Sequence, residues 1–456
     1  MNGPGVTAPS ARRALVLLLL INLVNYVDRQ VLAAVVPSIQ KTFFGGTGSH
    51  GSEGLVALQE WSRSHLGFQP DLALIGVLSM AFMVLYMIGA PIFGRLAERH
   101  SRWFLVAVGV IAWSLASGAS GLAVTFFGLL LTRCLVGVGE AAYGPVAPTI
   151  ISDLYDVRDR GRVLAWFYLA IPVGSALGYV LGGAVAGSSI GEQGARLFGI
   201  HAESWRWAFF LVVPPGLALG ILSFFMREPG HHRAAGAGAR TPVRWRDYLV
   251  LARTPSWTLC TVGMTAMTFA IGGIAFWMPY FLAQRPGAPA SATVVFGAIT
   301  CVAGLAATLL GGIAGDRLRG RFSGSYFLVS GIAMLAGFPF MLLTLSAPFP
   351  VIWIWLFATC FCLFFNTGPT NTILANVSHP SIRAAGFALN ILVIHAFGDV
   401  LSPVVIGVMS DRWSMHAAFV VVGVMFVASG ILWLWGARYL DRDTARVENA
   451  LERAAS

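Results

Sequence analysis

The chain has 456 residues, of which 57% are hydrophobic and only 11% are charged, and its mean hydropathy is +0.74. A soluble globular protein carries about 25% charged residues, so this composition excludes that class and places much of the surface in lipid. The net charge is +10, but the basic residues are spread over short loops, which argues against nucleic acid as a partner. The five cysteines lie in apolar segments without a CxxC spacing, so neither a metal site nor a disulfide framework is predicted.

Twelve apolar segments follow one another along the chain. A helix that spans a membrane needs about 20 such residues. The first segment follows Arg12 and Arg13 as a signal peptide would, but it continues through Asn25 and Asp28 without a cleavage site, so we interpret it as a spanning helix. The sequence therefore predicts an all-α membrane protein with 12 transmembrane helices at 14–40, 72–95, 102–120, 123–152, 161–187, 206–226, 255–283, 291–315, 325–346, 350–377, 383–409 and 414–438.

The longest gap between these segments, 227–254, contains the polar, glycine- and alanine-rich stretch HHRAAGAGAR. It divides the chain into two six-helix halves. We therefore predict an N-terminal bundle (1–226), a cytoplasmic linker (227–254), a C-terminal bundle (255–438) and a cytoplasmic tail (439–456). Two outer loops, 41–71 and 188–205, are long, and we expect a short surface helix at 53–65 in the first.

The distribution of basic residues sets the orientation. With the N-terminus inside the cell, 22 of the 30 lysines and arginines fall in inner segments, six fall in outer segments and two lie within spans. Cytoplasmic loops carry such an excess of positive charge. Both termini are therefore predicted to be cytoplasmic.

The two halves repeat each other. GRLAER, starting at Gly94, is echoed 218 residues later by GIAGDR, starting at Gly312, with the glycine, the acid and the arginine matched. A second echo, at an offset of 224, links the glycines of 174–183 to those of 398–407. Repeated halves are typical of secondary transporters, whose site lies between the repeats.

The repeated loop carries charges suited to a gate at the cytoplasmic face. Its acids and arginines are able to form charge-assisted bonds to a neighbouring helix end in one conformation and to lose them in another. Arginines that merely hold the loop inside are the alternative. The gating candidates are Glu98, Arg99, Arg102, Asp316 and Arg317.

Arg133 and Glu140 lie seven residues apart within one apolar segment. Seven helical residues return to the same face about 10 Å further along, and ionisable groups at such depth are costly and usually functional. Counting residues from the ends of the two segments places Asp28 of the first segment at a depth in the membrane between those of Arg133 and Glu140. Desolvation favours a neutral carboxyl group whereas a nearby guanidinium favours the ionised form, so we predict proton coupling at Asp28, Glu140 and Arg133. A static ion network that joins the two helices is the alternative.

Other polar residues interrupt the apolar segments. Arg29 is turned about 100° from Asp28 and is expected either to pair with a neighbour or to bind an anionic head group. His395 and Asp399 share a helix face and form a second polar site, either for a proton or as a hydrogen-bonded pair between helices. Asn366 and Asn371 suit a cavity lining.

Several motifs resemble those of known transporter families. The loop GRLAERHSR (94–102) resembles the inner-loop signature of the major facilitator superfamily. The glycines of 174–183 resemble its antiporter motif, although Tyr179 stands where proline is expected. Narrower resemblances, to a bacterial-type member of the Spinster family, are carried by NYVDR (25–29), RCLVGVGEAAY (133–143), APTIISDL (147–154), AIPVGSALGY (170–179) and HAFGDVLSP (395–403).

The resemblance implies the major facilitator fold and proton-coupled, alternating-access transport of a lipid-like solute such as sphingosine-1-phosphate or a lysophospholipid. On that basis the predicted substrate contacts are Arg133, Arg29, Tyr26, Asn25, Asn366 and Asn371. An exporter of drugs or organic anions is the alternative within transport, and a non-transporting membrane sensor is the alternative from another class. A monomeric, multi-pass protein of a bacterial inner membrane is expected, with protons, membrane lipid and an amphiphilic solute as partners.

No enzyme is predicted. The chain has no Walker loop of the form GxxxxGK[ST], so ATP is not expected as an energy source, and it has no HExxH pair. No cofactor is expected.

Overall fold

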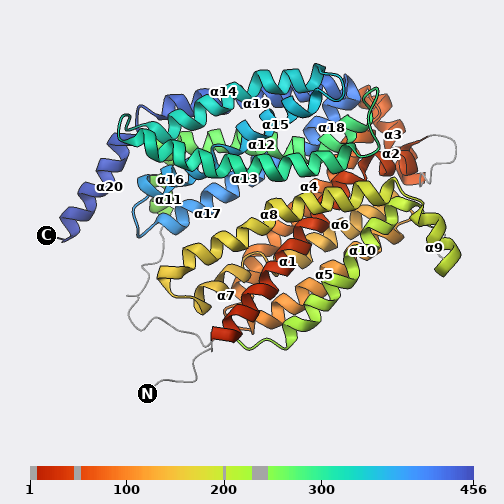
Figure 1. Ribbon diagram of the computed structural model, residues 1–456, viewed down its shortest axis with the longest axis horizontal. Helices are drawn as coiled ribbons and strands as arrows, with labels where there is room; N and C mark the ends of the chain where they lie inside the picture. The colour runs from red at the N-terminus through yellow and green to blue at the C-terminus, as the bar shows by residue number, and fades with distance from the viewer. Residues whose placement is uncertain (1–7, 46–52, 199–201, 229–244, 456) are drawn as a thin grey trace. The chain divides into compact units, whose positions relative to one another are not determined.

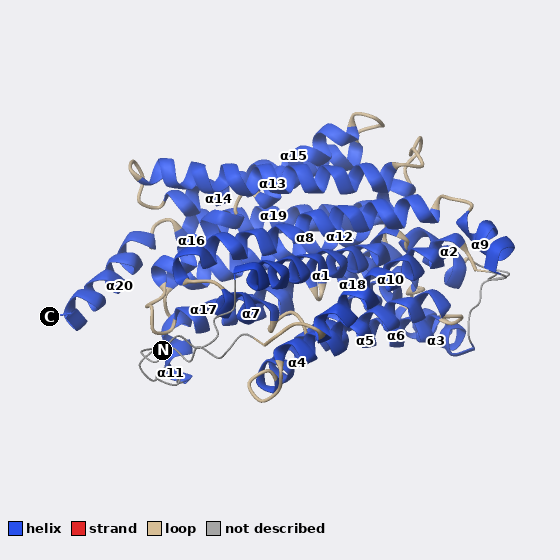
Figure 2. Ribbon diagram, turned by 60° about the horizontal axis from the view of Figure 1, so that its bottom comes forward, coloured by secondary structure: helices blue, strands red, loops and turns tan. Residues whose placement is uncertain are grey.

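The computed structural model describes residues 8–45, 53–198, 202–228 and 245–455. Within these ranges the chain forms helices and loops without strands (Figure 2). The HHRAAGAGAR stretch of the predicted linker lies outside the described residues. The helices of the first part are α1 (Ala8–Ala34), α2 (Val36–Phe44), α3 (Glu53–Leu66), α4 (Asp71–Leu96), α5 (Arg102–Leu122), α6 (Phe126–Ala141), α7 (Ala147–Leu154), α8 (Val157–Ala186), α9 (Ile190–Phe198) and α10 (Ser204–Phe224).

The second part contains α11 (Trp245–Ala252), α12 (Pro255–Ala283), α13 (Ala292–Arg319), α14 (Ser325–Ser346), α15 (Ile352–Phe364), α16 (Thr367–Val377), α17 (Arg383–Ile394), the π-helix η1 (His395–Asp399), α18 (Ser402–Arg412), α19 (Met415–Gly436) and α20 (Leu440–Ala455). The surface helix expected at 53–65 is confirmed as α3. The second long loop contains α9.

Eleven helices of the described chain are long and apolar enough to cross a membrane. The fourth predicted span, 123–152, is broken: α6 ends at Ala141, and α7 starts six residues later with Pro148 in its first turn. Between them the backbone closes tight turns, such as Ala142 N–H to the Gly139 oxygen. Proline has no N–H and is favoured at the start of a helix, so this part of the sequence starts a new helix instead of extending the old one.

Two compact units account for the described helices. One comprises residues 1–235 with 276–298, and the other comprises residues 236–275 with 299–456. The end of α12 and the start of α13 thus group with the first unit. The bundle boundaries at 226 and 255 remain a prediction.

In the first unit α1 lies along α8 (Figure 1). The glycines of α8 form this contact: a Cβ added at Gly174 would meet the Leu23 backbone oxygen, and one added at Gly178 would meet that of Val27. Small residues let helices approach closely in membranes. The glycines of the antiporter-like motif therefore bring α8 against the stretch of α1 that surrounds Asp28. Helices α5 and α10, and α4 and α6, form the other main contacts of the unit.

In the second unit α14 packs against α19 and α15. Helix α17 continues through η1 into α18, and α18 packs against α19. The glycines of α12 face this broken helix, since a Cβ at Gly272 would meet Asp399 and the Ser402 hydroxyl. Single-turn π-helices of this kind are rare and occur often at functional sites.

The α1–α8 contact gives a test of the fold. We expect Gly178→Ala to lower the thermal unfolding temperature in detergent, because its Cβ has no room beside the Val27 oxygen and overpacking costs about 1–3 kcal/mol. Gly312→Ala is the matched control, since a Cβ there meets no atom within 4 Å. Equal unfolding temperatures for the two variants would contradict the packing described.

Candidate functional site

Four charged side chains gather inside the first unit, two from α1 and two from α6. Asp28, Arg133 and Glu140 are each 1% exposed, and the side chain of Arg29 is 18% exposed. Two carboxyl groups and two guanidinium groups therefore share a nearly water-free space. Charges in such a space persist only where opposite charges and hydrogen bonds compensate them.

Glu140 is paired with Arg29. Its Oε2 atom lies 2.6 Å from Arg29 Nη2 and accepts a hydrogen bond from Arg29 Nε at 2.7 Å. The guanidinium carbon of Arg29 also lies 5.0 Å from the ring centres of Tyr26 and Phe82 and 5.1 Å from that of Tyr86. A carboxylate and three aromatic rings thus hold one cation, an arrangement that favours a positive charge away from water.

Neither Asp28 nor Arg133 forms an ion pair with a described residue, whereas Glu140 does, although its Oε1 atom is also unbonded. The Ser117 hydroxyl of α5 donates a hydrogen bond to Asp28 Oδ1, whereas Asp28 Oδ2 bonds to no described residue. The guanidinium of Arg133 lies 5.8 Å from the ring centres of both Phe82 and Phe209. Its Nε and Nη1 atoms have no hydrogen-bond partner among the described residues, although its charge acts on Asp28.

Glu140 therefore has a different partner from the one its helix face suggested. Arg133 and Glu140 share a face of α6, but seven residues separate them by about 10 Å along the axis, which is too far for an ion pair. Arg29 reaches Glu140 from α1 instead. Tyr26 lies against Arg29, and Asn25 lies beside Glu140 with its amide nitrogen unbonded to any described residue.

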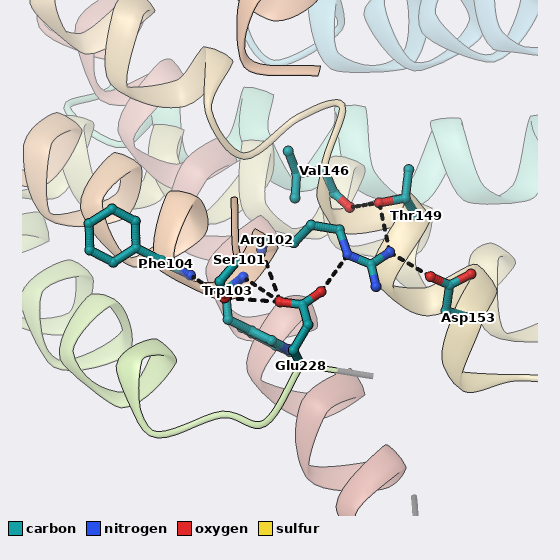
Figure 3. A network of polar contacts seen from close by, with 8 residues as sticks. All are labelled: Ser101, Arg102, Trp103, Phe104, Val146, Thr149, Asp153 and Glu228. Carbon is teal, nitrogen blue, oxygen red and sulfur yellow. Dashed lines mark hydrogen bonds and ion pairs between the residues drawn. The ribbon is translucent and has the colours of Figure 1, made fainter. Parts of the chain in front are cut away.

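A second charged cluster lies where α5 begins. Arg102 is 6% exposed, and it lies 2.6 Å from Asp153 of α7 and 2.6 Å from Glu228, which follows α10 (Figure 3). Glu228 also accepts hydrogen bonds from the Ser101 hydroxyl and the Arg102 backbone N–H, and Arg102 Nη1 donates to Thr149 at 3.5 Å. One arginine thus joins three helix ends of the first unit.

The other candidates from the repeated loop are placed differently. Glu98 and Arg99 are exposed and make no side-chain hydrogen bond or ion pair to a described residue. In the second unit the Tyr326 hydroxyl donates to Asp316 at 2.8 Å, while Arg317 is exposed. Arg102 is therefore the member of the loop motif that is anchored within its own unit.

The polar residues of the second unit do not form a charged cluster with one another. Asn366 is fully buried and donates to the Leu363 oxygen at 2.8 Å, whereas Asn371 is exposed and donates to the Thr367 oxygen at 2.8 Å. His395 Nδ1 lies 2.9 Å from both Asp399 oxygens across the π-helix, with both side chains partly exposed.

Sequence reasoning missed several members of these clusters. Ser117, Phe82 and Tyr86 are ordinary membrane-helix residues in the sequence, and they gain their roles from helices that meet only in the fold. Glu228 left one signal: it is an acid directly after a predicted span, in an inner segment rich in arginine. Asp153 lies in the APTIISDL motif, but the sequence alone gave it no role.

Comparisons with known proteins agree with this architecture. Residues 18–398 match the family model described as Major Facilitator Superfamily. Protein spinster homolog 1 of Homo sapiens is 35% identical over 428 residues, which cover 88% of this chain and 74% of that protein. The sphingosine-1-phosphate transporter SPNS2 of Danio rerio is 31% identical over 477 residues, covering 95% and 86%.

A solved structure has the same fold. It is that of a bacterial homolog to the human lysosomal transporter Spinster, in an inward-facing and unoccupied conformation. It matches with a TM-score of 0.80 and 21% identity, over 96% of this chain and 99% of that one.

The Arg102 cluster gives a second test. We expect Arg102→Gln to lower the unfolding temperature, because it leaves Asp153 and Glu228 without their shared cation and bonds to charged groups contribute about 1.5–3 kcal/mol. Arg99→Gln, in the same loop but exposed, serves as the control and should unfold as the parent does. A destabilised Arg99→Gln beside an unaffected Arg102→Gln would refute the role given to Arg102.

Proposed function

The chain belongs to the major facilitator superfamily and, within it, to the spinster family, and it is a membrane transporter; on that premise we propose that it couples protons to the movement of an amphiphilic, lipid-like solute. The solute class is a lysophospholipid or a sphingosine-1-phosphate-like molecule, carried by alternating access. The buried Glu140–Arg29 pair is the observation that supports this proposal most directly.

A proton on Glu140 would leave Arg29 without its counter-charge. An uncompensated buried charge costs several kcal/mol, so the protonated state is stable only if another anion replaces the carboxylate or if the helices rearrange. The three rings around Arg29 keep the cation in place while its partner changes. An anionic head group that reaches Arg29 would therefore favour protonation of Glu140, and by linkage protonation would favour binding of the head group.

Arg133 supports an anionic solute for a second reason. It is buried, and its Nε and Nη1 atoms are not hydrogen-bonded to described residues. Each of these N–H groups is able to donate a charge-assisted hydrogen bond to a phosphate or carboxylate oxygen. Phe82 and Phe209 supply apolar surface beside it, so a charged head with an alkyl chain attached fits the surroundings better than a small polar ion does.

Alternating access also needs contacts that exist in one state and not in another. We propose that the Arg102 cluster and the Asp316–Tyr326 bond hold the cytoplasmic ends of their units in one such state, and that the units correspond to moving domains near residues 1–226 and 255–438. We further propose that the protein works as a monomer in the inner membrane of a bacterium.

Proton coupling has a direct test. In proteoliposomes loaded with a lysophospholipid, an imposed pH gradient should change the transport rate of the parent protein. Glu140→Gln or Asp28→Asn should abolish that response, because neither side chain then binds a proton in the working range. An unfolding temperature equal to that of the parent protein, together with normal membrane insertion, would show that each variant is folded.

Glu60→Gln, on the exposed face of α3, is the matched carboxyl-to-amide control and should keep the response. If the gradient still drives both buried variants, the charged cluster does not couple protons. Movement of amphiphilic drugs or organic anions without movement of lysolipids would favour the exporter alternative, and no transport of either class would favour a sensor.

Linkage between proton and head group gives a further prediction. Stabilisation of the purified protein by an anionic lysophospholipid should strengthen as pH falls, by at most about tenfold in affinity per pH unit for one coupled proton. Glu140→Gln should bind with an affinity that no longer varies with pH. Thermal unfolding at two pH values, with the lysolipid titrated, measures this. Binding that weakens at low pH in the parent protein would reverse the proposed sign of coupling.

A further inference from the structure

We propose that the second unit carries a separate binding site for an anionic phospholipid head group, where α11, α12, α19 and α20 meet. A pocket of about 250 Å³ lies there. Its lining comes from the end of α11, the first turn of α12, the last turn of α19 and the residues before α20: Ala252, Arg253, Pro255, Thr258, Leu259, Trp435 and Tyr439. These residues belong to one compact unit and include none of the buried charges described above.

Arg253 gives the pocket its charge. Its side chain is exposed, and it forms no ion pair, ring contact or side-chain hydrogen bond with a described residue. The first turn of α20 carries two carboxylates. Asp443 is already engaged, since it accepts from the Ser256 backbone N–H at 3.0 Å and from Arg442 at 3.2 Å, and Asp441 forms no ion pair with Arg253. The positive charge of Arg253 is therefore open to an anion from outside the protein.

A second cation lies against the pocket wall. The guanidinium carbon of Arg442 is 5.2 Å from the ring centre of Tyr439, a lining residue. Arg442 is 65% exposed. Arg442 also pairs with Asp443 at 3.2 Å, so Arg253 is the lining cation available to a phosphate, and guanidinium groups bind phosphate oxygens in a bidentate manner.

The remaining walls indicate a lipid instead of a free anion. Pro255, Leu259 and Trp435 are apolar or aromatic, and Trp435 is 49% exposed. Val262 follows Thr258 by one helical turn and Ile431 precedes Trp435 by one turn, and both are exposed, at 45% and 56%. An apolar track therefore leads from the pocket along two spanning helices, which an acyl chain would cover and a soluble phosphate would leave bare.

The position of the pocket at the ends of two spanning helices agrees with a lipid ligand. The pocket joins the first turn of one candidate span to the last turn of another, on the side to which the arginine distribution assigns the cytoplasm. Tryptophan and tyrosine concentrate at membrane interfaces, and basic pockets between helices on the cytoplasmic side bind anionic head groups. The lipid would also hold α20 to α12, beside the contact made by Asp443.

Native mass spectrometry of the full chain in detergent, with added palmitoyl-oleoyl phosphatidylglycerol, tests the site. Arg253→Gln should weaken binding of one lipid by about tenfold, the factor that corresponds to about 1.4 kcal/mol. Arg321→Gln, an exposed arginine outside the pocket, is the matched control and should bind as the parent does. Equal binding by the two variants would overturn the proposal.

Two further arms separate the sources of the anion. Phosphatidylcholine with the same chains should bind more weakly than phosphatidylglycerol to the parent protein, and glycerol 3-phosphate should not compete with the lipid at equal concentration. Competition by glycerol 3-phosphate would identify a site for soluble phosphate compounds and refute a lipid site. Arg29→Gln should still bind phosphatidylglycerol, because Arg29 and Glu140 belong to the other unit. Loss of lipid binding in Arg29→Gln would instead assign the bound lipid to the charged residues of α1 and α6.

Discussion

The cost of burying charge inside an apolar bundle is the constraint on which the first unit depends. Four ionisable groups lie together on α1 and α6, and three of them are 1% exposed. The fold compensates them unevenly. Glu140 and Arg29 neutralise each other at 2.6 Å, with three rings around the cation. Asp28 relies on one hydroxyl and on the field of Arg133, and Arg133 keeps two unbonded nitrogen atoms. The cluster thus contains one ion pair and two further charged groups that form no ion pair with a described residue.

The packing of the surrounding helices serves this arrangement. The glycines of α8 let α1 approach closely, which fixes the depth at which Arg29 meets α6. Ser117 reaches Asp28 from α5, and the Phe82 ring of α4 lies near both guanidinium groups. A shift of α1 against α6 would change the Arg29–Glu140 distance. The ion pair thus depends on the position of α1 relative to α6.

Hydropathy and charge along the chain predicted most of the architecture but little of the pairing. Length and apolar composition suffice to locate spanning helices, because lipid demands a continuous apolar segment. The end of α6 at Ala141 was not predicted, because the apolar segment continues through the turn that follows it. Asp28, Arg133 and Glu140 stood out because charge is costly at their depth. Which arginine pairs with Glu140 depends on how α1 is rotated against α6, and the sequence alone left this open. The roles of Tyr86 and Glu228 depend in the same way on contacts between distant segments.

The two units repeat in sequence but not in charge. The first unit buries Asp28, Glu140 and Arg133 together, whereas the second has buried Asn366 and a partly exposed His395–Asp399 pair across a π-helix. Asparagine offers hydrogen bonds without a charge to compensate, so Asn366 lies buried without an ion pair. The buried charges of the first unit thus lie beside helices whose close packing, as between the α8 glycines and α1, holds them in place.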